Sequence, residues 1–243
     1  MSHVVPLQVI FTVIIPTLNE AGVITTTLER TVSLGFDDII VVDGGSTDGT
    51  TVRVEAARIG MPRDAAVSLR LISASAGRGR QLNAGAAAAM GEVLVFLHAD
   101  SHLPPHARAS IEQALSDPEV VGGRFDVRFD RPSLCGSVIS ALMNLRSRLT
   151  RISTGDQAIF VRRRIFEALG GFSDVPIMED IDLSVRLKRR GRTAALSDCV
   201  TTSFRRWERQ GPMRTIVLMW SLRFLYWIGV SPHRLARFYA SVR

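Results

Sequence analysis

Apolar, strand-like runs alternate with helix-like segments through the first half of the chain, and this alternation constrains the fold more than any other feature. The runs lie at 9–15, 39–42, 69–72 and 93–97, and the helix-like segments lie at 22–33, 48–59 and 80–90. Strands that are apolar throughout, rather than at alternate positions, predict a parallel sheet that is covered on both faces. The order strand, helix, strand therefore predicts an α/β fold.

The pattern changes after residue 117. Residues 124–130 alternate apolar and polar side chains, which predicts a strand with one wetter face. Residues 156–163 predict another strand, followed by a helix that ends at Gly170-Gly171. Apolar side chains also alternate in 181–190, but acidic residues at its start and basic residues at its end favour a helix. A basic, aromatic-rich helical region is expected to complete the chain.

Charge and cysteine usage limit the partners and the compartment. The net charge is +7, with Lys188 the only lysine, and an arginine-rich surface suits phosphates, nucleotides or acidic lipid headgroups. Cys135 and Cys199 match no metal or redox spacing, which predicts buried free thiols. We see no signal peptide, and Arg223 interrupts a late apolar stretch that is shorter than the ~20 residues needed to span a bilayer. These features predict a cytoplasmic protein.

Polar side chains stand where each of the four apolar runs ends. The first run leads into PTLNE, the second into VVDGGSTDGT, the third into SAGRGRQLNAG, and the fourth into HADSHLPP. Any one of these segments could be only a helix cap, a turn or a solvated loop. Ligands of open parallel sheets bind beyond the carboxyl ends of the strands, so the four segments together predict one binding crevice.

The ordered set of motifs resembles the family-2 glycosyltransferases, which are inverting enzymes of the GT-A fold. The similarity covers about residues 11–192 through VIIPTLNE, VVDGGSTDGT, GRGRQLNAG, VLVFLHAD and MEDIDLSVRLKRRG, and is greatest to small, soluble bacterial members. It implies a GT-A-like (Rossmann-like), mostly parallel sheet flanked by helices over residues 1–210. The nucleotide-binding half would be 1–117 and the acceptor half 118–210, with a C-terminal helical extension, 211–243, packed on them.

The resemblance also implies roles for individual residues. His98-Ala99-Asp100 falls at the Asp-x-Asp metal motif, and Glu179-Asp180 falls at the catalytic base, with Asp180 preferred. Asp43 would accept a hydrogen bond from the nucleotide base. The remaining residues expected to line the nucleotide site or its phosphates are Pro16, Thr17, Leu18, Asn19, Glu20, Arg78 and Arg80.

The implied chemistry needs a divalent cation and a base. Mg²⁺ or Mn²⁺ would stabilise the leaving diphosphate, and Asp100 offers the hard oxygen ligand that these ions prefer. His98 departs from the family pattern: it would bind Mn²⁺, contact the donor's ribose or phosphate (the favoured reading), or do neither. On a straight strand, His98 and Asp100 would share one face. His102 is expected on the surface.

Asp156 and Gln157 are expected on the acceptor side, and Arg206 with Trp207 could face a sugar or a phosphate. The function predicted is inverting transfer of a sugar from a nucleotide-diphosphate donor, preferably UDP-linked, to an unidentified acceptor hydroxyl. The alternatives are a sugar nucleotidyltransferase and a non-catalytic membrane-surface or scaffold protein. The aromatic and basic C-terminal residues suit peripheral contact at the inner membrane face, or packing within the molecule or a homodimer. The basic clusters lack interleaved aromatics, so no nucleic acid is expected.

Overall fold

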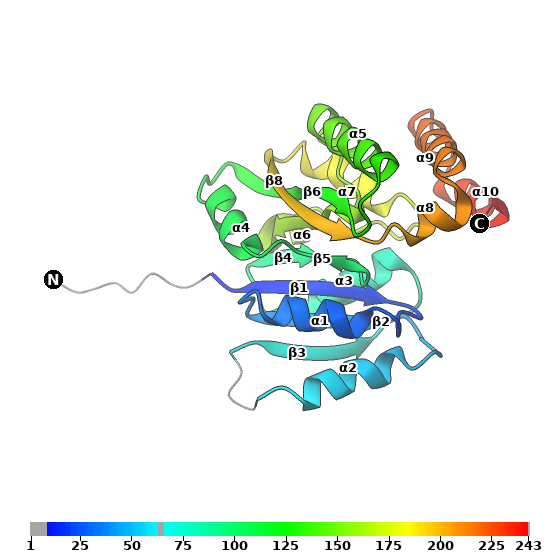
Figure 1. The fold of residues 1–243 in the computed structure, drawn as a ribbon. Helices are drawn as coiled ribbons and strands as arrows, with labels where there is room; N and C mark the ends of the chain where they lie inside the picture. Colours follow the sequence, from blue (N-terminus) through cyan, green and yellow to red (C-terminus); the bar gives the residue numbers. More distant parts are fainter. Residues whose placement is uncertain (1–8, 63–65, 243) are drawn as a thin grey trace.

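A single sheet of eight strands organises the molecule, in the order β3-β2-β1-β4-β7-β6-β8-β5 (Figure 1). The structure is a computed structural model and describes residues 9–62 and 66–242. Four of the seven strand pairings are parallel: β3-β2, β2-β1, β1-β4 and β6-β8. The expected mostly parallel α/β sheet is confirmed.

The first half forms the four-stranded parallel part of the sheet. Its elements are β1 (Phe11–Thr17), α1 (Ile24–Val32), β2 (Asp38–Asp43), α2 (Thr50–Ile59), β3 (Ser68–Ser73), α3 (Arg78–Ala88) and β4 (Val93–Phe96). Each predicted strand and helix of this half is present, with ends shifted by a few residues. The apolar runs are explained by burial on both faces: Val13 and Ile15 pack into one core cluster, whereas Ile14 packs into the other.

The second half adds antiparallel strands and more helices. Its elements are β5 (Ser101–His102), α4 (Ala107–Leu115), β6 (Val120–Phe129), α5 (Leu134–Thr150), the 3₁₀ helix η1 (Gly155–Gln157), β7 (Ile159–Arg162), α6 (Arg163–Ala168), α7 (Glu179–Leu187), β8 (Arg192–Thr202), α8 (Arg205–Gln210), α9 (Pro212–Trp227) and α10 (Pro232–Val242). β7 joins the halves because it pairs antiparallel with both β4 and β6.

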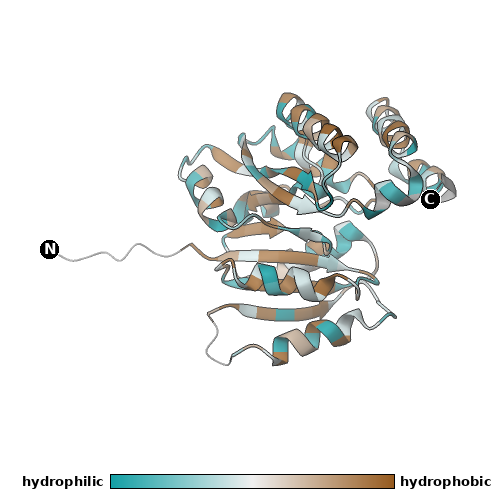
Figure 2. Ribbon diagram, viewed as in Figure 1, coloured by the Kyte–Doolittle hydropathy of each residue, from teal (hydrophilic) through white to brown (hydrophobic). Residues whose placement is uncertain are grey.

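Helices cover the sheet on both faces. α1, α2 and α4 contribute to one apolar cluster, and α3, α6 and α7 contribute to the other. Figure 2 shows the strands mostly in the hydrophobic colour and the helices with mixed faces. A third, small cluster holds the C-terminal helices together through Leu218, Leu222 and Leu235, with Ile177 and Met178 packed against it.

Several expectations of the sequence differ from the structure. Residues 192–202 form β8 inside the predicted helical region, and the 17-residue helix α5 was not anticipated. Cys135 is exposed and Cys199 is half-buried, so the prediction of buried thiols is wrong, because Cys135 lies on the solvent side of α5 and Cys199 on the β8 strand near the sheet edge. Among the described residues, no helix is both long and apolar enough to cross a membrane.

Candidate active site

The loops that follow β1 and β2 are tied together at the carboxyl edge of the sheet. Asn19 Oδ1 accepts a hydrogen bond from the Thr47 amide at 2.9 Å, and the Asn19 amide donates to Ser46 Oγ at 2.9 Å. The Glu20 amide donates to Thr50 Oγ1 at 2.8 Å. Residues 16–20 and the DGGSTDGT segment therefore form one continuous wall, as the motif order implied. Within it, Thr17 is buried, Pro16 half-buried and Leu18 exposed.

Asp43 stands at the base of this wall with one oxygen bound and one free. Its Oδ2 accepts hydrogen bonds from the amides of Gly45 at 2.9 Å and Ser46 at 3.0 Å. Its buried Oδ1 has no donor among the described residues. Burial raises the pKa of Asp43, but the Ser46 and Gly45 hydrogen bonds outweigh that effect and lower it below its usual value. Asp43 is therefore an anion with one acceptor position available to a ligand.

The chain turns sharply after β4, so His98 and Asp100 do not share a strand face. β4 ends at Phe96, residues 99–100 form a turn, and Ser101 then begins β5, which pairs with β8. The straight-strand premise is therefore wrong, because pairing with β8 redirects the chain. His102 in β5 is half-buried rather than on the surface and lies 3.1 Å from Arg30.

Both ring nitrogens of His98 are occupied by protein groups. Arg78 Nη1 lies 3.1 Å from His98 Nε2, and Asp156 Oδ1 lies 3.2 Å from Nδ1. The guanidinium can only donate, so Nε2 accepts and Nδ1–H faces the carboxylate. This arrangement leaves no lone pair on the ring for a metal ion.

Glu20 and Asp100 offer oxygen ligands instead. Burial raises the pKa of Glu20, and the negative charge of Asp100 raises it further. A divalent cation held between Glu20 and Asp100 would offset the negative charge that raises the pKa of Glu20. Among the described residues, no group of three or more histidine, cysteine or acidic side chains could hold a metal. Mg²⁺-type ions often use one or two carboxylates plus substrate phosphates, so the pair fits a cation that arrives with a diphosphate.

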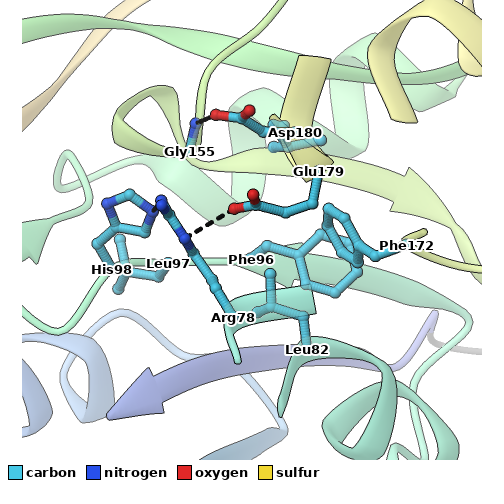
Figure 3. Close-up of a pocket in the computed structure, with 10 residues that line it drawn as sticks. Arg78, Leu82, Phe96, Leu97, His98, Gly155, Phe172, Glu179 and Asp180 are labelled. Atoms are coloured by element: carbon cyan, nitrogen blue, oxygen red, sulfur yellow. Dashed lines mark hydrogen bonds and ion pairs between the residues drawn. The ribbon is translucent and has the colours of Figure 1, made fainter. Parts of the chain in front are cut away.

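A narrow pocket lies between α3, the end of β4 with the residues after it, η1 and α7 (Figure 3). Glu179 also lines the pocket, although it is almost fully buried, and forms an ion pair with Arg78, 2.7 Å from Nε to Oε1. Burial raises the pKa of Glu179, while Arg78 opposes that effect. Arg80 points elsewhere, because it pairs with the exposed Asp174 at 2.7 Å. Of the two predicted phosphate arginines, only Arg78 lines the pocket.

Asp180 is half-buried at the pocket, next to Glu179 (Figure 3). Its Oδ2 accepts a hydrogen bond from the Gly155 amide at 2.8 Å, and its Oδ1 accepts one from the Ile181 amide. A side chain at position 155 would overlap His98 Nε2, so this close approach requires glycine. Gly155 was not anticipated as a site residue, although it directly precedes the predicted Asp156.

Of the remaining predicted residues, some contact residues of the pocket and others only pack within the protein. Asp156 contacts His98, whereas Gln157 is fully buried and its Oε1 accepts from the Thr154 amide at 3.2 Å. Trp207 packs parallel to Phe204, with ring centroids 6.4 Å apart, in an aromatic cluster. The side chain of Arg206 lies outside the described residues. Its neighbour Arg205 lies 3.9 Å from Glu20, which places α8 beside the crevice.

Comparison with known proteins identifies relatives of this architecture. The family model described as glycosyl transferase family 2 matches residues 12–170. An uncharacterized glycosyltransferase from Nostoc sp. (strain PCC 7120) is 32% identical over 112 residues, which cover 45% of this chain and 34% of that protein. The chain thus spans about a third of this curated relative.

Solved structures share the fold. A mannosyltransferase from Pyrobaculum calidifontis, in complex with GDP-Man and Mn²⁺, is 25% identical with a TM-score of 0.63, covering 82% of this chain and 58% of that chain. Residues 1–349 of TarS from S. aureus, in complex with UDP-GlcNAc, are 19% identical with a TM-score of 0.64, covering 80% and 58%. Glucosyl-3-phosphoglycerate synthase from Mycobacterium tuberculosis, in complex with Mn²⁺, UDP and phosphoglyceric acid, is 20% identical with a TM-score of 0.62, covering 91% and 79%.

Proposed function

The chain belongs to glycosyl transferase family 2, and from this premise we propose that it transfers a sugar from a nucleotide-diphosphate donor to an acceptor hydroxyl with inversion. The observation that carries the proposal is the position of Asp180. Both acids line the pocket, but Asp180 is half-buried, whereas Glu179 is almost fully buried and bound by Arg78. One available carboxylate suits an inverting transfer, which needs a single general base and no covalent sugar intermediate.

The donor would lie along the wall formed by the β1 and β2 loops. Asp43 Oδ1, buried and without a donor among the described residues, would accept a hydrogen bond from the nucleotide base. Asp100 and Glu20 would hold Mg²⁺ or Mn²⁺, which when bound stabilises the negative charge of the leaving diphosphate. His98 would act indirectly by keeping Arg78 and Asp156 in place. The known complexes of structural neighbours with UDP, UDP-GlcNAc or GDP-Man and Mn²⁺ support a donor of this class.

In the transfer step, the acceptor oxygen attacks the anomeric carbon as the bond from that carbon to the diphosphate oxygen breaks. The nucleoside diphosphate leaves with the bonding electrons, and Asp180 takes the proton of the acceptor hydroxyl. The Gly155 amide holds Asp180 Oδ2 and so orients the carboxylate. General-base assistance of this kind contributes about 10²–10⁴-fold to the rate.

A screen of nucleotide-sugars tests this function. Thermal unfolding with UDP- and GDP-sugars, each with and without Mn²⁺, should show a donor whose stabilisation depends on the metal. Phosphorus NMR of the reaction should then show release of a nucleoside diphosphate. Pyrophosphate exchange with a nucleoside triphosphate would instead indicate a sugar nucleotidyltransferase. Neither stabilisation nor turnover with any donor would contradict the proposal and favour a non-catalytic protein on a transferase fold.

A second candidate property, peripheral membrane contact, has its own observation. α5 and α9 each carry a stripe of exposed apolar side chains at helical spacing: Leu134, Val138, Leu142, Leu145 and Leu149 on α5, and Met213, Val217, Trp220, Phe224 and Trp227 on α9. Arginines also lie on both helices, and this combination is typical of helices that rest on a membrane surface. Such contact would suit an acceptor that is presented from a membrane.

A further inference from the structure

Two arginines lie near Asp180 without a hydrogen-bonding partner. Arg146 comes from α5 and Arg223 from α9, and each interacts electrostatically with Asp180. The Arg146 Nε and Nη2 atoms are buried and have no acceptor among the described residues. For Arg223, the described part of the chain likewise contains no hydrogen bond or ion pair to the guanidinium.

Other arginines that are wholly or partly buried in this protein have partners. The pairs are Arg70 with Asp38, Arg108 with Asp37, Arg124 with Asp126, and Arg186 with Asp182. Arg162 donates instead to backbone carbonyls, including that of Val120 at 2.8 Å. The unpaired state of Arg146 and Arg223 is therefore a local exception and not a general property of the fold.

Guanidinium groups that lack acceptors are energetically unfavourable in the absence of an anion. The pKa of Arg146 is lowered to about 10, first by burial and then by the nearby positive charge of Arg223, while Asp180 opposes both effects. Burial also lowers the pKa of Arg223. Both side chains nevertheless remain cations at neutral pH, and the buried Nε and Nη2 atoms of Arg146, which lack an acceptor among the described residues, destabilise the folded protein. A stability role alone does not account for such a pair.

Among the described residues, neither of the nearby carboxylates forms a salt bridge with these arginines. Asp180 accepts from the amides of Gly155 and Ile181, and Asp156 faces His98. An anion from outside the chain would supply these acceptors, because planar guanidinium groups bind phosphate and carboxylate oxygens particularly well.

We propose that Arg146 and Arg223 form an oxyanion subsite for the acceptor, which carries a phosphate or carboxylate close to the hydroxyl that receives the sugar. This inference rests on the proposed function. The two arginines come from α5 and α9, whereas the donor wall comes from the β1 and β2 loops and the turn after β4. Asp180 interacts with both arginines and lines the pocket, so an anion held there would bring its hydroxyl to the base.

The test compares single substitutions in the full-length protein. Arg146→Gln and Arg223→Gln remove one positive charge each, and Arg189→Gln removes a matched charge from an exposed side chain in the turn after α7. Calorimetric titration with inorganic phosphate and with glycerol 3-phosphate measures soluble anions. Sedimentation with phosphatidylcholine vesicles, with and without phosphatidic acid, measures a lipid phosphate. Titration of the best nucleotide-sugar with Mn²⁺ is run on every variant.

We expect anion binding to weaken at least about tenfold in both site variants and to stay unchanged in Arg189→Gln, since charge-assisted hydrogen bonds are lost. If the site variants bind the soluble anions more weakly, the acceptor is soluble. If they bind only the phosphatidic acid vesicles more weakly, the acceptor is a lipid. Nucleotide-sugar affinity should change less than twofold. The thermal midpoint should stay equal or rise, because an unpaired buried charge is removed, whereas a structural arginine would lower it.

Two results would overturn the proposal. In the first, nucleotide-sugar binding and turnover are normal, but anion binding is either not saturable or equal in all variants. This result would rule out the subsite and leave the proposed function intact. Anion binding that depends on the two arginines, without any nucleotide-sugar binding, would instead overturn the proposed function and the acceptor role with it.

Discussion

Glu179 and Asp180 are adjacent acids with different surroundings, and this difference assigns them different roles. Glu179 is buried against the Arg78 guanidinium, whereas Asp180 is held by the Gly155 amide at the pocket. We therefore expect Asp180→Asn to lower the transfer rate by at least about 10²-fold. Nucleotide-sugar affinity should stay nearly unchanged, because the side-chain oxygen of the new asparagine can still accept the hydrogen bond from the Gly155 backbone amide. Steady-state kinetics and calorimetry measure the two quantities.

Glu179→Gln is the matched comparison for this prediction. It should lower the thermal midpoint, because Arg78 loses its ion pair with the buried Glu179 carboxylate. If Asp180→Asn retained most of the transfer rate with the true acceptor, the general base would have to be reassigned, and Glu179 would be the next candidate.

Asp100 carries the second prediction at this scale. Asp100→Ala should abolish the increase in nucleotide-sugar affinity that Mn²⁺ produces, because Glu20 alone would provide the remaining protein carboxylate. Asp174→Ala, which removes an exposed acid paired with Arg80, serves as the control and should behave like the unmodified protein. Undiminished metal dependence of donor binding in Asp100→Ala would mean that the cation is held elsewhere.

Gly155 offers a third prediction, based on space. Gly155→Ala would place a methyl group against His98 Nε2 and disturb the amide that holds Asp180. We expect transfer to fall by about 10-fold or more, since small misplacements of reacting groups are costly, with donor affinity largely kept. Gly22→Ala is the matched control, because nothing lies within 4 Å of the added methyl group. Equal rates for the two variants would contradict a positioning role for Gly155.

At the scale of elements, the exposed stripes of α5 and α9 predict lipid binding. The protein should sediment with anionic liposomes at low salt, and less so at high salt. Leu142→Asp and Trp220→Asp should each weaken sedimentation, whereas Val52→Asp, at an exposed position on α2, should not. No binding at low salt would contradict membrane contact. Concentration-dependent self-association without lipid, lost in the same two variants, would indicate a homodimer interface.

The sequence predicted the elements of the first half well because each strand there is apolar throughout and each polar strand end has a motif. It failed at β8, whose side chains are mostly exposed or half-buried and show no clear alternation. The prediction that His98 and Asp100 share one strand face failed for a different reason. The turn at His98–Asp100 depends on the pairing of Ser101 with Thr202, which is far away in the chain. Arg146 and Arg223 stand in no motif, and their electrostatic interaction with Asp180 arises only from where the fold places α5, α7 and α9.

At the scale of the whole molecule, the two large apolar clusters lie on the faces of the sheet, and the third holds α9 and α10. A chain ending at residue 210 loses only the third cluster. We therefore expect residues 1–210 to fold cooperatively, with a somewhat lower thermal midpoint because Ile177 and Met178 lose their cover. The truncated protein should still bind nucleotide-sugar with Mn²⁺, since Asp43, Asp100 and Glu20 remain.

Transfer should respond differently, because truncation removes Arg223 while leaving Asp180 in place. Slow hydrolysis of the donor should persist, whereas transfer to an anionic acceptor should fall at least as far as in Arg223→Gln. Thermal unfolding, donor titration and product analysis on the same preparation separate these effects. If the truncated chain bound no donor although it folded, α9 and α10 would belong to the nucleotide site, and the division at residue 210 into a catalytic domain and an extension would be wrong.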